Sequence, residues 1–62
     1  SVTVIAPTAA EADGWATAIV VAGVEKGLEM AEKQKLAVYM IVKENDGFAE
    51  RFSSGFSKFK QP

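Results

Sequence analysis

The hydrophobic pattern of the chain is dominated by Thr8 to Gly23, TAAEADGWATAIVVAG, in which small or apolar side chains fall on nearly every side of a helix. Thr8 precedes Glu11 by three residues, which is the spacing of a capping box at the start of a helix. Gly23 stands where a glycine typically ends a helix. Because a helix that is apolar on all sides is usually a buried one, we expect this segment to lie inside a larger structure.

The rest of the pattern predicts one more helix and three strands. Ser1 to Ala6 is short and β-branched, which favours a strand. Val24 to Lys35 carries one apolar stripe at helical spacing. Leu36 to Val42 is a continuous apolar run, typical of a strand covered on both faces. The turn signal Asp46-Gly47 then predicts a hairpin, with Phe48 to Ser53 as a more polar edge strand.

These elements predict an α+β fold in the order β-α-α-β-β, with two helices packed on a small, mainly antiparallel sheet. In the tail, Phe56 and Phe59 are three residues apart, which favours one helical turn that docks two rings, and Pro62 ends it. A helix that is apolar all round and a strand that is covered on both faces need more layers than this chain supplies. We therefore expect residues 1–62 to form a single segment of a larger layered domain, or to bury themselves against copies of themselves.

Composition narrows the possible chemistry. The chain has 62 residues, a net charge of −1, and neither cysteine nor histidine, which excludes disulfides, thiol catalysis and imidazole ligands within it. No basic block predicts nucleic-acid binding, and no apolar run approaches the ~20 residues of a membrane span. No hydroxyl has a neighbouring base at a motif spacing, so we assign no catalytic residue. Because the chain begins with Ser1, we expect it to start inside a longer protein.

Asp13 and Thr17 are the candidate site residues. At four residues apart on a helix, they place a carboxylate and a hydroxyl side by side on one face. Both are hard oxygen donors of the kind that Mg²⁺ binds, often together with a substrate phosphate. Two other interpretations stay open on the residues alone. Asp13 could help to cap the first turn of the helix, or its face of the helix could be exposed to solvent and bind no ion.

Several motifs resemble those of the FAD:protein FMN transferases, the ApbE family, over almost the whole chain. The most specific are the strand S-V-T-V followed by A-P-T, and the helix motif A-D-x-x-x-T-A at residues 12–18. The segments GVEKGLEMAEK, DGF and SSGF add to the likeness. The resemblance identifies the chain as a C-terminal segment of such an enzyme.

The resemblance implies an activity and a setting. Family members are bacterial enzymes, typically exported to the cell envelope or periplasm and lipid-anchored. They split FAD with Mg²⁺ and attach FMN through a phosphoester bond to a threonine of a partner flavoprotein. The Asp and Thr of the helix motif ligate the cation in the family, and those positions are Asp13 and Thr17 here. The resemblance assigns no flavin-contacting residue in this segment.

The segment departs from the family pattern in what it lacks. The upstream H-x-x-D-P-type segment, with its functional histidine, is absent, so we expect half a metal site and no activity from the chain alone. Its partner would then be the missing upstream part of the same chain or another copy. The rival hypotheses are a self-associating or interaction module without enzymatic activity, and a module that binds a divalent cation without catalysis.

Overall fold

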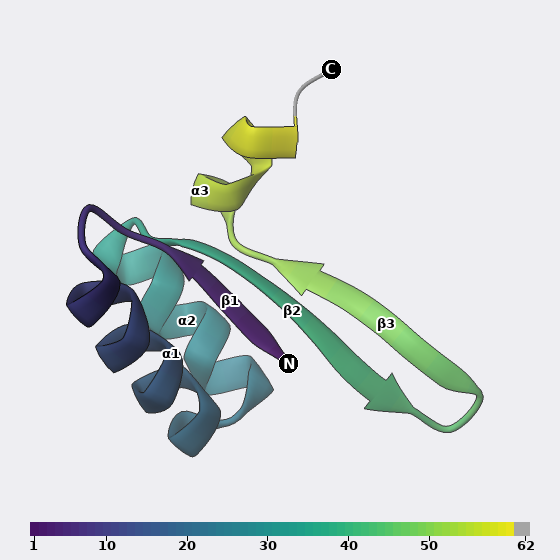
Figure 1. Cartoon of the computed structure of the whole chain (residues 1–62). Coiled ribbons are helices and arrows are strands. Elements are labelled where there is room, and N and C mark those ends of the chain that lie inside the picture. Colours follow the sequence, from purple (N-terminus) through teal and green to yellow (C-terminus); the bar gives the residue numbers. More distant parts are fainter. Residues whose placement is uncertain (61–62) are drawn as a thin grey trace.

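The computed structural model describes residues 1–60 and confirms the predicted order of elements (Figure 1). Its elements are β1 (Val2–Ile5), α1 (Ala9–Ala22), α2 (Val24–Gln34), β2 (Ala37–Glu44), β3 (Gly47–Phe52), α3 (Ser54–Ser57) and the 3-10 turn η1 (Lys58–Lys60). The short α3 and η1 contain the phenylalanines of the predicted tail turn. The expected stop at Pro62 lies outside the described residues.

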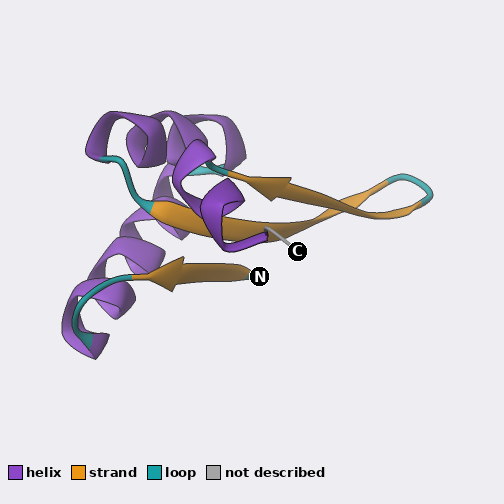
Figure 2. Cartoon of the chain, turned by 90° about the horizontal axis from the view of Figure 1, so that it is seen from above, coloured by secondary structure: helices purple, strands orange, loops and turns teal. Residues whose placement is uncertain are grey.

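The three strands form one antiparallel sheet, which confirms the predicted mainly antiparallel pairing, and their order, which the sequence left open, is β1-β2-β3. The hairpin of β2 and β3 is confirmed, and Glu44 pairs with Gly47, so that Asn45 and Asp46 form the loop. Gly47 has a φ of 139°, a conformation that residues with a Cβ rarely adopt. Figures 1 and 2 show the turn of this hairpin reaching away from the two long helices.

Helices α1 and α2 cover one face of the sheet. The buried core consists of Ile19 from α1, Ala31 from α2, and Val38 and Met40 from β2. Successive side chains of a strand point to opposite faces, so Tyr39 lies on the other face of the sheet. There the ring of Phe56, from α3, stacks on Tyr39 with centroids 5.3 Å apart. The sheet is therefore the middle layer, with the two long helices on one side and the short tail helix on the other.

The close packing of α1 on α2 depends on two glycines. Gly23 has a φ of 94°, and its N–H bonds the carbonyl of Ile19 at 3.0 Å to end α1. Its own carbonyl accepts from the N–H of Gly27 at 2.7 Å in the first turn of α2. A Cβ on Gly27 would lie only 2.6 Å from Cγ2 of Ile19, so the side chain of Ile19 fills the space that a larger residue would need.

A third glycine and a buried serine attach α3 to the sheet. The hydroxyl of Ser53 donates to the carbonyl of Leu36 at 2.6 Å and accepts from the N–H of Val38 at 2.9 Å. A Cβ on Gly55 would lie 2.6 Å from the same carbonyl oxygen of Leu36. The backbone N–H of Ser54 donates to the Glu32 carboxylate at 2.8 Å, which ties the start of α3 to α2. These contacts fix α3 over the beginning of β2.

Two elements are only partly covered within residues 1–60. Helix α1 is covered on one face only, and Val20 and Val21 are 64% and 82% exposed. Strand β2 is buried at Ala37 and Val38, but Ile41 further along is 40% exposed. Within the described residues, α1 is covered on one side, by α2, by β1 and, through Ile19, by β2. On the other face of the sheet, α3 covers only part of β2 because it is four residues long. Among the described residues, no helix combines the length and hydrophobicity that a bilayer span requires.

Candidate metal site

Helix α1 begins as the capping pattern predicts. The hydroxyl of Thr8 accepts from the backbone N–H of Glu11 at 3.1 Å and donates to the Glu11 carboxylate, also at 3.1 Å. Thr8 thus satisfies one of the N–H groups that a helix leaves free in its first turn. The helix then continues for 14 residues without a proline or a basic residue, and this regular backbone positions the candidate site.

Asp13 and Thr17 lie one turn apart on α1, and both are exposed. The Thr17 hydroxyl donates to the backbone carbonyl of Asp13 at 2.9 Å, so its proton is directed at the helix and its lone pairs face outward. The Asp13 carboxylate has no hydrogen bond or ion pair within residues 1–60. Because Thr8 caps the helix, a capping role for Asp13 is not observed, and two oxygen acceptors remain available on one exposed face.

The pair does not make a complete metal site within the described part of the chain. No cluster of three or more carboxylate, imidazole or thiol side chains that could hold a metal ion occurs among residues 1–60. Mg²⁺ requires near-octahedral coordination by oxygen, commonly from one or two carboxylates, substrate phosphates and waters. Asp13 and Thr17 would fit such an ion as two of its ligands, with waters, substrate oxygens or other protein oxygens supplying the rest.

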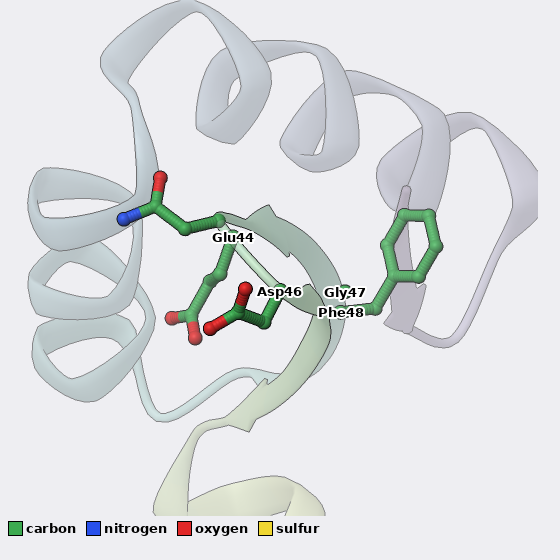
Figure 3. Close-up of a pocket in the computed structure, with 5 residues that line it drawn as sticks. Glu44, Asp46, Gly47 and Phe48 are labelled. Carbon is green, nitrogen blue, oxygen red and sulfur yellow. The ribbon is translucent and has the colours of Figure 1, made fainter.

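A second acidic location, which the sequence did not indicate as a site, is the turn of the hairpin. Residues 44–48 surround an open hollow of about 550 Å³. Figure 3 shows the carboxylates of Glu44 and Asp46 on one side of the turn and the ring of Phe48 pointing away from them. All of these residues belong to one tight turn, and it offers only two carboxylates. The hollow is therefore the ordinary concavity of a hairpin turn.

One titratable group on the face away from the long helices has a shifted pKa. The Tyr39 hydroxyl donates to the Glu50 carboxylate at 2.6 Å. This hydrogen bond favours the neutral phenol, so the pKa of Tyr39 is raised above its ordinary value of 10.0, with smaller contributions from desolvation and from the negative charge of Glu50. The Tyr39 ring also stacks on Phe56, so we assign Tyr39 a packing role between β2 and α3.

Comparison with known proteins gives one consistent family. The family model described as the ApbE family matches residues 1–40. The chain is 58% identical over 59 residues to the FAD:protein FMN transferase of Klebsiella pneumoniae (strain 342), a match that covers 95% of this chain and 17% of that protein. The protein of the same name from Escherichia coli (strain K12) is 54% identical over 59 residues, again covering 95% and 17%.

Solved structures agree with the sequence relatives. The flavin transferase ApbE from Vibrio cholerae superposes with a TM-score of 0.88 at 46% identity, over 92% of this chain and 18% of that one. The apo flavinyl transferase ApbE from Pseudomonas stutzeri gives a TM-score of 0.88 at 40% identity, with the same coverage. The fold is thus part of the domain seen in these proteins, and the chain spans less than a fifth of their length. On these matches, the chain belongs to the ApbE family.

Proposed function

We propose that this chain is the C-terminal segment of a Mg²⁺-dependent flavin transferase that splits FAD and attaches FMN to a threonine of a partner flavoprotein. Family membership and the names of the relatives support the transferase activity and FAD as substrate. The threonine target and the dependence on Mg²⁺ rest on the resemblance of the A-D-x-x-x-T-A motif. The same resemblance supports a lipid-anchored protein of the bacterial cell envelope.

In this proposal, Asp13 and Thr17 are ligands of the divalent cation. The observation that carries the assignment is the Thr17 hydroxyl, which donates its proton to the Asp13 carbonyl and so presents lone pairs beside an unpartnered carboxylate. When bound, the cation would neutralise negative charge on the FAD pyrophosphate during phosphoryl transfer. The regular backbone of α1 holds the two oxygens one turn apart, so that a ligand meets them already oriented.

The segment by itself is expected to be inactive. It supplies two ligand side chains, and within residues 1–60 no further cluster could complete the coordination of a metal ion. It also contains no histidine. The remaining ligands and the flavin-binding groups would come from the rest of a full-length family member and from the substrate.

The experiment replaces the matching segment of the Klebsiella pneumoniae relative with residues 1–59 of this chain and measures FMN bound covalently to an acceptor flavoprotein. Asp13→Asn removes the charge with little change in shape, so transfer should fall by about 100-fold or more, the scale of losing one contact that stabilises the transition state. Thr17→Val should reduce transfer strongly, and Thr17→Ser, which keeps the hydroxyl, should restore most of it.

Asp46→Asn, at the hairpin turn, is the matched control, because it removes the same charge from an exposed position far along the chain. It should leave transfer and its Mg²⁺ dependence unchanged. Equal transfer by the Asp13→Asn and Asp46→Asn proteins across a Mg²⁺ titration would show that the ligand assignment is wrong.

A further inference from the structure

The depth at which helix α1 packs on α2 is set at one position that has no side chain. Ile19, two residues after the candidate ligand Thr17, is 1% exposed and lies against Gly27 of α2. A Cβ on Gly27 would lie 2.6 Å from Cγ2 of Ile19 and 3.3 Å from its backbone oxygen. Because that oxygen belongs to the backbone of α1, a side chain at Gly27 would press on the helix itself as well as on a side chain.

The sheet and the first turn of α2 also restrict the space at Gly27. Cε of Met40, on β2, would lie 3.4 Å from the same Cβ. The N–H of Gly27 donates to the carbonyl of Gly23 at 2.7 Å, which holds the first turn of α2 in place. Carbon atoms in contact are about 3.5–4.0 Å apart, so a methyl group at Gly27 requires a displacement on the order of 1 Å. Helix α1 has to take up part of that displacement.

We propose that Gly27 is a positioning residue for Asp13 and Thr17, because its missing side chain lets α1 lie where these two side chains can ligate the cation. The inference rests on the proposed function, which makes both residues ligands. Helix α1 is regular along its whole length, so a shift at Ile19 moves both ligands with it. Mg²⁺ demands near-ideal octahedral geometry, with bonds of about 2.0–2.1 Å. Groups that orient metal ligands from behind typically contribute about 10–100-fold to metal affinity.

Gly55 provides a matched control elsewhere in the fold. A Cβ on Gly55 would also lie 2.6 Å from a neighbouring atom, here the carbonyl oxygen of Leu36. Gly55 belongs to α3, which packs on the face of the sheet away from α1. Gly55→Ala should therefore disturb the packing of α3 and leave α1 in place. A loss of cation binding that follows only from Gly27→Ala is then due to the position of α1, and not to a general loss of stability.

The test uses the Klebsiella pneumoniae relative that carries residues 1–59 of this chain, with Mn²⁺ alone as the probe, because Mn²⁺ accepts the same octahedral oxygen coordination as Mg²⁺. The dissociation constant of Mn²⁺ is measured from the electron paramagnetic resonance signal of the free ion, which requires no transfer activity. Gly27→Ala should weaken Mn²⁺ binding by at least about tenfold, whereas Gly55→Ala should change it by less than about twofold. In Ile19→Leu/Gly27→Ala, the leucine has no Cγ2, so most of the affinity should return.

Circular dichroism verifies that each variant is folded, and if Gly27→Ala is not, all proteins are measured in a stabilising osmolyte that restores its fold. A folded Gly27→Ala protein with the affinity of the parent would show that the proposal is wrong, as would an equal loss in Gly55→Ala. Asp13→Asn separates this result from the proposed function. If Asp13→Asn weakens Mn²⁺ binding and Gly27→Ala does not, only the positioning role fails. If Asp13→Asn leaves binding unchanged, the ligand assignment fails, and the positioning role with it.

Discussion

The two faces of α1 carry similar aliphatic side chains but differ in solvent exposure. On the inner face, Ile19 is 1% exposed and fits against Gly27 of α2. On the outer face, Val21 is 82% exposed beside the candidate ligands. The difference lies not in the residues but in the neighbours, since α2 and β1 both lie on the inner side. A helix that is apolar all round therefore indicates that both faces need cover, without indicating which part of a protein provides it.

The largest contrast should come from truncating one aliphatic residue on each face. Ile19→Ala leaves a cavity in the core and should lower the free energy of unfolding by about 2–5 kcal/mol. Val21→Ala removes atoms that are already in water, so its effect should stay within about 0.5 kcal/mol. Urea denaturation of the 62-residue chain measures both. Equal losses from the two variants would contradict the one-sided burial of α1.

A smaller loss of stability is expected at the contact between α1 and α2, where the packing around Ile19 is closest. In Gly27→Ala, the new methyl would lie 2.6 Å from Cγ2 of Ile19, a branched atom that cannot swing aside. Overpacking of this kind costs about 1–3 kcal/mol, and the higher helix propensity of alanine offsets about 1 kcal/mol of that loss. The midpoint of urea unfolding should fall. A variant that gains the full helix-propensity stabilisation of about 1 kcal/mol would show that α1 and α2 can move apart to admit the methyl group.

A glycine-to-alanine substitution should instead increase stability at Gly14. This glycine lies inside α1, and nothing lies within 4 Å of the position that a Cβ would take. Gly14→Ala should therefore stabilise the 62-residue chain by up to about 1 kcal/mol, through helix propensity and a less flexible unfolded state. In a full-length family member, a loss of stability instead would show that another part of that protein lies against Gly14. Thermal unfolding of both proteins distinguishes these results.

The smallest effect is expected on the other face of the sheet, where a polar contact replaces apolar packing. The pKa of Tyr39 is raised by the hydrogen bond to Glu50, so Glu50→Gln should lower it towards 10.0. The folded state holds its proton more tightly than the unfolded state. The stabilisation from this contact is therefore complete below about pH 10 and is lost as the pH rises through the folded-state pKa.

Tyr39 is the single tyrosine of the chain, so tyrosinate absorbance reports its titration without ambiguity. Phe48→Leu, which leaves the carboxylate of Glu50 in place, is a suitable control and should not change the titration. An unchanged Tyr39 pKa in the Glu50→Gln variant would mean that the hydrogen bond does not persist in solution.

Most of the fold could be predicted because its signals are local. The Thr8 hydroxyl and Gly23 bound α1 within one residue of the expected ends, and the signal at Asp46-Gly47 identifies the hairpin. The candidate ligands share a face simply because they are four residues apart on a helix. The contacts that join distant segments were not predicted: the bonds of Ser53 to Leu36 and Val38, and the Glu32 carboxylate at the start of α3. Such contacts depend on how elements pack, and no sequence spacing encodes them.

The sequence by itself determined the elements, their order, and the presence of a carboxylate and a hydroxyl on one helix face, because turn chemistry and helical periodicity act over a few residues. Only the tertiary structure decided that Ile19 is enclosed while Val21 remains in water. Burial is a property of neighbours in space. It was settled by the positions of α2 and the sheet, which enclose Ile19 and leave Val20 and Val21 largely exposed.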